Sequence, residues 1–142
     1  DAVMVVPPYY FPLDDLALLR YFERLAQSIH GNIYIYNFPD RTGYSISAKV
    51  ILELARRHEN IVGLKDTTSS MDHTREVIAA IKGERADFEI YSGFDGNYAH
   101  NVISGGDGCI GGLSNIFPEI CASWTQPCGK TTPTRSPADS KL

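Results

Sequence analysis

The fold of this chain is decided by the stretch Ile61-Val62-Gly63-Leu64-Lys65-Asp66-Thr67-Thr68. It begins as an apolar run of strand length and reaches a lysine. An ammonium ion inside such a run is costly to bury unless it is paired or loses its proton. Because a neutral amine attacks carbonyl groups, a lysine at the end of a buried strand is a candidate for Schiff-base formation. The alternative is a lysine that has already emerged into solvent at the strand's end.

Strand patterns and helix patterns alternate on both sides of this stretch. The strand patterns cover residues 3–6, 33–37, 61–65, 88–92 and 108–111. Helical apolar spacing covers residues 13–29, 47–57, 71–82 and 98–103, with a further helical start at 118–124. This alternation with short connections predicts parallel strands joined by right-handed crossovers. Two architectures fit it, an open doubly wound sheet or part of a (β/α)8 barrel.

In either architecture the site gathers at the carboxyl ends of the strands. Tyr36, Lys65, Gly93 and Ile110 all lie at such ends, although they are far apart in the sequence. We therefore expect them to converge on one pocket.

Four motifs carry a resemblance to a known family. They are Tyr36-Asn37-Phe38-Pro39-Asp40-Arg41-Thr42-Gly43, Gly63-Leu64-Lys65-Asp66-Thr67, Ser92-Gly93-Phe94-Asp95 and Gly105-Gly106-Asp107-Gly108-Cys109-Ile110-Gly111. In this order and spacing they resemble the dihydrodipicolinate synthase / N-acetylneuraminate lyase family of pyruvate-dependent class I aldolases. The resemblance covers about residues 1–124 and implies an α/β fold, the last five strands of a (β/α)8 TIM barrel.

The resemblance implies two catalytic residues and no cofactor. Lys65 matches the lysine that forms a Schiff base with a 2-keto acid, whose protonated imine then accepts electrons from the adjacent carbon. Tyr36 matches the tyrosine that relays protons to and from the carbinolamine and the aldol oxygen. Without the motif, Tyr36 would be read as a core aromatic with a satisfied hydroxyl.

Six further residues match substrate-binding positions of the family, namely Arg41, Thr67, Gly93, Asp95, Ile110 and Gly111. Arg41 is typical of the synthase branch, where a planar guanidinium holds the carboxylate of an aldehyde. Thr67 and Asp95 match positions that contact polyol hydroxyls in aldolases for sugar acids. These signals conflict, so the resemblance implies a lyase or synthase acting on pyruvate or a longer 2-keto acid, with a 2-keto-3-deoxy-sugar-acid or N-acetylneuraminate-type aldolase as the alternative.

Charge and composition indicate which kinds of partner the protein is not expected to bind. The net charge is -4 with scattered basic residues, and 43% of the residues are hydrophobic, so we expect no nucleic-acid or membrane partner. The three cysteines lack metal-ligand spacing, and we interpret the four histidines as surface or helix-cap groups, so no metal site is expected. We expect a cytoplasmic protein that binds a small 2-keto acid and an aldehyde, from a parent that is a homotetramer or dimer.

The chain is expected to be a fragment. It opens directly on a strand pattern, and the segment that holds the keto-acid carboxylate in the family belongs to an earlier strand that this sequence does not contain. We divide the chain into a partial barrel domain, 1–124, and an irregular tail, 125–142, that is disordered or frame-shifted. A chain with open sheet edges is expected to be inactive alone, and a non-catalytic remnant is the alternative of another class.

Overall fold

Five parallel strands form one sheet in the order in which they occur along the chain, β1-β2-β3-β4-β5. The strands are β1 (Ala2–Val5), β2 (Asn32–Asn37), β3 (Ile61–Asp66), β4 (Glu89–Ser92) and β5 (Gly108–Cys109). The structure is a computed structural model that describes residues 1–128. It divides into two units, Asp1–Gly112 and Leu113–Leu142, which are described separately.

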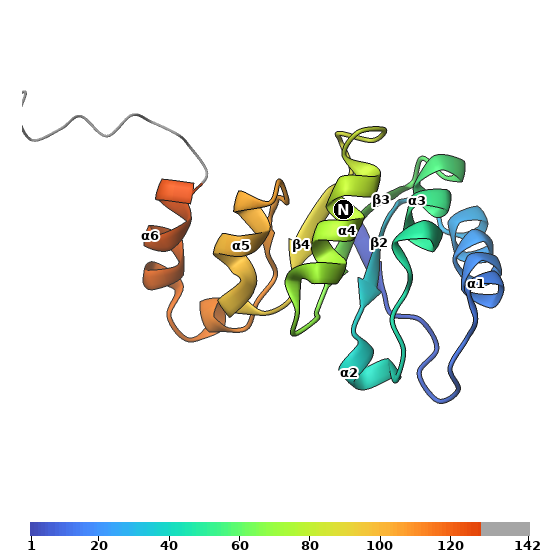
Figure 1. Cartoon of the computed structure of the whole chain (residues 1–142), viewed down its shortest axis with the longest axis horizontal. Helices are drawn as coiled ribbons and strands as arrows, with labels where there is room; N and C mark the ends of the chain where they lie inside the picture. The colour runs from blue at the N-terminus through green and yellow to red at the C-terminus, as the bar shows by residue number, and fades with distance from the viewer. Residues whose placement is uncertain (129–142) are drawn as a thin grey trace, which may run out of the picture. The chain divides into compact units, whose positions relative to one another are not determined.

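The helices of the first unit connect successive strands and lie in a row (Figure 1). They are α1 (Asp15–Ser28), α3 (Ala48–Arg57), α4 (Met71–Ile81) and α5 (Tyr98–Ile103), with the short α2 (Pro39–Thr42) and the 3-10 turn η1 (Asp95–Asn97) at the ends of β2 and β4. Sequential strand order is the arrangement of a (β/α)8 barrel, whereas a doubly wound sheet reverses its order. The first unit is therefore an arc of a barrel.

The helix starts are set by side-chain caps that the sequence supplies. The Asp14 carboxylate accepts a hydrogen bond from the Ala17 amide at 2.8 Å, and the Ser47 hydroxyl accepts one from the Val50 amide at 3.3 Å. Ser70 caps α4 in the same way, accepting from the Asp72 amide at 3.2 Å. Such caps satisfy amides that have no partner within the helix.

Most predicted bounds agree with the structure to within a residue or two, and two regions differ. The fifth strand, predicted over residues 108–111, is paired only at Gly108–Cys109. The segment after β2, read as a turn through Gly43, forms the single-turn helix α2, and Gly43 ends it with a φ of 84°, which glycine adopts without strain.

The second unit contains the 3-10 turn η2 (Leu113–Asn115) and the helix α6 (Pro118–Cys128). The helix predicted to start around residue 118 is present, and it continues past Trp124. The division at residue 124 stays a prediction, and residues 129–142 of the predicted tail lie outside the described residues. None of the helices within residues 1–128 has the length and hydropathy that a membrane span requires.

The apolar core lies between the helices and one face of the sheet. Its fully buried members include Leu18 and Phe22 of α1, Ile51 and Leu54 of α3, Val77 and Ile81 of α4, and the strand residues Ile33, Ile35, Ile61, Leu64 and Ile90. Successive strand side chains point to opposite faces. Tyr34, Tyr36, Lys65, Glu89 and Tyr91 are half-buried and therefore lie on the other face.

An irregularity in β3 allows apolar side chains from both halves of the strand to point to the core face. Ile33 pairs with Ile61, but the next residue, Tyr34, pairs with Gly63, so one residue of β3 is left over. Ile61 and Leu64 would otherwise point to opposite faces, yet both are fully buried in the same core. The register that follows places Lys65 opposite Tyr36 and Asp66 opposite Asn37.

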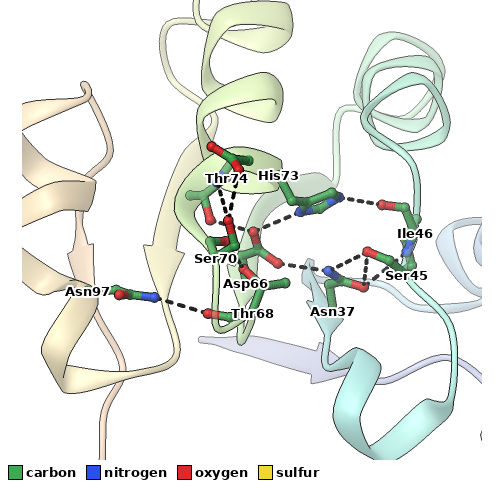
Figure 2. Close-up of polar contacts among 10 residues, drawn as sticks. Asn37, Ser45, Ile46, Asp66, Thr68, Ser70, His73, Thr74 and Asn97 are labelled. Carbon is green, nitrogen blue, oxygen red and sulfur yellow. Dashed lines mark hydrogen bonds and ion pairs between the residues drawn. The ribbon is translucent and has the colours of Figure 1, made fainter.

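A closed ring of hydrogen bonds joins the ends of β2 and β3 to the segments around them (Figure 2). The Asn37 amide donates to Asp66 at 2.8 Å, and the Ile46 backbone N–H donates to the Asn37 oxygen at 3.0 Å. The two ring nitrogens of His73 lie 2.8 Å from Asp66 and 2.7 Å from the Ile46 carbonyl, which closes the circuit. Thr74 adds a further hydrogen bond to Asp66 at 2.6 Å.

His73 differs from the surface or cap role expected for it. It lies in the first turn of α4 with only 18% of its side chain exposed, and both of its ring nitrogens face acceptors. Burial acts to lower the pKa of His73, but the hydrogen bond and charge of Asp66, together with the Ile46 carbonyl, raise that pKa above its usual value. Only the imidazolium can donate to both acceptors at once.

We expect the substitution Gly63→Ala to destabilise the fold by about 1–3 kcal/mol. A Cβ atom at Gly63 would lie 2.4 Å from a ring carbon of Tyr34 and 2.7 Å from the Glu89 carbonyl oxygen. Gly31→Ala is the matched control, because nothing lies within 4 Å of the Cβ position there. Urea unfolding of both variants measures the difference, and equal stabilities would contradict the close approach at Gly63.

The raised pKa of His73 predicts that its contribution to stability falls with rising pH. This contribution is fully present below the unfolded-state pKa of about 6.5 and is lost as the pH rises through the higher folded-state pKa. Unfolding free energies at about pH 6 and about pH 9 should therefore differ less in His73→Gln than in the unsubstituted chain. His30→Gln, on an exposed site, should retain the full difference.

Candidate active site

Lys65 and Tyr36 lie side by side on the face of the sheet opposite the helices. They are register partners on neighbouring strands, and the Lys65 Nζ lies 4.3 Å from the centroid of the Tyr36 ring. A charged ammonium is attracted to the face of an aromatic ring at this distance. Lys65 is half-buried, so its amine is neither enclosed in the core nor fully in solvent. The pair brings an amine and the ring of a phenol into contact.

Aromatic stacking extends the site beyond the end of β2. The rings of Tyr36 and Phe38 stack with their centroids 5.7 Å apart, and the edge of Phe94 meets Phe38 at 6.3 Å. The Arg41 guanidinium carbon lies 5.8 Å from the Phe38 ring centroid. Within residues 1–128 this exposed guanidinium has no ion pair or hydrogen bond, so its donors are open to a ligand.

Thr67 and Gly93 approach each other closely just past the ends of β3 and β4. A Cβ atom at Gly93 would lie 1.7 Å from the Thr67 hydroxyl oxygen, so only glycine fits beside that side chain. Thr67 is 3% exposed, and its hydroxyl has no hydrogen-bond partner among the described residues. A buried hydroxyl without a partner is uncommon and marks this position as one to test.

Asp95, Ile110 and Gly111 form the rim beside β4 and β5. The Gly112 amide donates to the Asp95 carboxylate at 3.0 Å, and a Cβ atom at Gly111 would lie 2.0 Å from that same carboxylate. The Ile110 amide donates to the Ser92 carbonyl at 2.9 Å, while its side chain is 38% exposed. The predicted site residues thus fall into three groups, and the contacts described lie within each group. One is around Tyr36 and Lys65, one around Thr67 and Gly93, and one around Asp95 and Gly111.

A polar cluster lies next to Lys65 on the same face of the sheet: Tyr91 pairs with Lys65, and Tyr34 and Glu89 pair with Gly63 one step below. Tyr34 and Tyr91 both donate hydrogen bonds to the Glu89 carboxylate, the second at 2.9 Å. Burial and the Glu89 hydrogen bond raise the pKa of Tyr91 to about 12 and raise the pKa of Tyr34 as well. Both phenols therefore stay protonated near neutral pH and act as donors to Glu89.

Sequence reasoning missed the aromatic pair Phe38 and Phe94 and the ring through Asn37, Asp66 and His73. A signal for the ring was present, because Asn37 and Asp66 follow Tyr36 and Lys65 directly and strand alternation turns them to the core side. A buried polar residue there needs a partner, but the sequence does not name it. Within the described part of the chain, no cluster of three or more His, Cys, Asp or Glu side chains could hold a metal ion.

Comparison with known proteins places this geometry in a family. The family model described as the dihydrodipicolinate synthetase family matches residues 1–129. A 4-hydroxy-tetrahydrodipicolinate synthase from Kosmotoga olearia is 41% identical over 118 residues, covering 83% of this chain and 40% of that protein. An uncharacterized DapA-like lyase from Thermococcus onnurineus is 39% identical over 120 residues, covering 84% of this chain and 41% of that protein.

Solved structures agree with these relatives. The crystal structure of YagE from Escherichia coli K12, a prophage protein of the dihydrodipicolinic acid synthase family in complex with pyruvate, matches with a TM-score of 0.86 and 33% identity. The match covers 89% of this chain and 43% of YagE. The chain thus spans about two fifths of the length of the relatives it matches. By these matches over nearly its whole described length, the chain belongs to the dihydrodipicolinate synthetase family.

Proposed function

We propose that this chain carries the Schiff-base centre of a lyase or synthase that acts on pyruvate or a longer 2-keto acid. The observation that carries the proposal is the contact between Lys65 and Tyr36, with the Lys65 Nζ 4.3 Å from the ring centroid of its register partner. Family membership and the pyruvate complex of YagE support it. The activity belongs to the whole protein, of which the described residues supply the nucleophile and the phenol.

The proposed reaction begins with attack of the neutral Lys65 amine on the C2 carbonyl of pyruvate. Tyr36 moves a proton to the carbinolamine oxygen, which leaves as water, and the nitrogen is left as a protonated imine. Loss of a C3 proton to a base then gives an enamine. The enamine carbon attacks the aldehyde carbon, whose oxygen takes up a proton, and water hydrolyses the new imine to release the product and free Lys65.

The second substrate of this proposal is an aldehyde that carries its own carboxylate. The exposed guanidinium of Arg41, without an ion pair or hydrogen bond within residues 1–128, is suited to bind a carboxylate through two parallel hydrogen bonds. The Thr67 hydroxyl is buried, so it presents no open site to a polyol in this structure.

An aldolase for a sugar acid is the second candidate. YagE, to which a 2-dehydro-3-deoxy-D-gluconate aldolase activity is assigned provisionally, is 35% identical to this chain over 120 residues. The unpartnered Thr67 hydroxyl favours this candidate, because a sugar hydroxyl could satisfy it if the rim beside Gly93 opened. The oligomeric parent, a homotetramer or dimer, remains a prediction.

Borohydride reduction in the presence of pyruvate tests the Schiff base. When the chain is part of a complete barrel, we expect a reduced pyruvyl adduct on Lys65, found by intact mass and peptide analysis, and its loss in Lys65→Ala, because the side chain that forms the imine is gone. Lys49→Ala, at an exposed position of α3, should leave the adduct unchanged. A chain that unfolds cooperatively but forms no adduct would favour the non-catalytic remnant.

Substitution of Arg41 separates the two candidate substrates. In a complete barrel that contains this chain, Arg41→Gln should lower the rate of condensation with a carboxylated aldehyde by about 10- to 100-fold, because a charge-assisted pair of hydrogen bonds is lost. With a neutral polyol aldehyde the same variant should keep its rate to within about twofold. Product yields with both aldehydes give the comparison, and equal losses would contradict a carboxylate-binding role for Arg41.

A further inference from the structure

The ring of hydrogen bonds lies on the core face of the sheet, and two of its members directly follow the two proposed catalytic residues in the sequence. Asn37 follows Tyr36, Asp66 follows Lys65, and the two pairs occupy consecutive steps of the same parallel ladder. Tyr36 and Lys65 lie on the open face, whereas Asn37 and Asp66 are 0% and 1% exposed on the core face. Figure 2 shows Asn37, at the end of β2, and Asp66, at the end of β3, pointing toward each other.

We infer that Asp66 is a positioning residue of the proposed reaction, which holds Tyr36 at a fixed place relative to Lys65 through its hydrogen bond to Asn37. This inference rests on the proposed function. Asp66 touches neither substrate nor the reacting atoms, and it acts through the backbone on which Lys65 and Tyr36 stand. Displacement of a catalytic group by about 1 Å is enough to reduce rates about 100-fold, so rigid support of this pair has a chemical effect.

Three side chains contact the Asp66 carboxylate. Its carboxylate accepts from Asn37 at 2.8 Å and from Thr74 at 2.6 Å, and lies 2.8 Å from the His73 ring. These partners come from β2 and from the first turn of α4, so the end of β3 is fixed from two sides. Hydrogen bonds to a buried carboxylate are stronger than neutral ones and leave donors orphaned when the carboxylate is removed.

The rest of the ring transmits this support to β2. Asn37 also accepts from the Ile46 amide at 3.0 Å, and the Ile46 carbonyl faces His73 at 2.7 Å. The Thr67 amide donates to the Asn37 carbonyl at 2.8 Å, so backbone and side chain both tie Asn37 to the end of β3. A slip of one strand end past the other would break several of these hydrogen bonds together. The position of Tyr36 over Lys65 is therefore coupled to the ring.

A double-mutant cycle tests this coupling in a complete barrel that contains the chain. The rate of the reduced pyruvyl adduct is measured in the unsubstituted chain, Asp66→Asn, Tyr36→Phe and the double variant. Asp66→Asn should slow adduct formation about 10- to 100-fold when Tyr36 is present and less than about twofold when Phe stands at position 36. The same loss in both backgrounds would mean that Asp66 only stabilises the fold, and would overturn the inference.

Proton NMR of the Lys65 side chain provides a readout that needs no pyruvate. Because Nζ lies over the Tyr36 ring, the ε-methylene protons should be shifted upfield in the unsubstituted chain. Asp66→Asn should return this shift toward that of a free lysine, and His30→Gln should not. If the shift is unchanged in folded Asp66→Asn, the inference fails. If the shift responds but pyruvate forms no adduct, the proposed function fails and the positioning role stands.

Milder variants keep the test decisive if Asp66→Asn does not fold. Thr74→Val removes one donor to Asp66, and His73→Gln breaks the ring itself between Asp66 and Ile46. In both, the adduct rate and the upfield shift should fall together while urea unfolding remains cooperative. A folded variant that loses its ring hydrogen bond but keeps the Lys65 shift would overturn the inference.

Discussion

The parallel ladder between β2 and β3 is the constraint on which the site depends. It places Tyr36 opposite Lys65 and Asn37 opposite Asp66, and it does so only after the extra residue between Ile61 and Gly63 has been absorbed. Without that irregularity, Ile61 and Leu64 could not both enter the core under the helices. The packing of apolar residues thus selects the register, and the register brings the amine and the phenol together.

The two faces of the sheet carry different kinds of side chain. The core face ends in Asn37, Asp66 and Ser92, which are buried and hydrogen-bonded, so the strand ends are fixed by polar contacts where the apolar core stops. The opposite face carries half-buried side chains, namely Tyr34, Tyr36, Lys65, Glu89 and Tyr91. Because successive side chains of a strand point to opposite faces, each buried polar residue at a strand end follows a residue of the open face. This gives a physical reason to consider Asp66 together with Lys65.

Close approaches give the site its shape. Gly63 leaves room for the Tyr34 ring, Gly93 for the Thr67 side chain and Gly111 for the Asp95 carboxylate, since a Cβ atom at each would lie within 3 Å of those neighbours. In each case the neighbour comes from an adjacent strand or loop that is distant in the sequence. The contact of the Arg41 guanidinium with the Phe38 ring, at 5.8 Å, is instead local, because the two residues are three positions apart.

The sequence by itself determined the alternation of strands and helices and the placement of Lys65 and Tyr36 at strand ends, because these depend on local pattern and spacing. The pattern of elements alone left open the choice between a doubly wound sheet and a barrel; the resemblance predicted a barrel, and the sequential strand order confirms it. The sequence did not identify the role of His73, because its partners Asp66 and Ile46 belong to other elements. Only tertiary structure could decide such contacts, since a buried polar side chain requires a partner but does not specify which distant residue provides it.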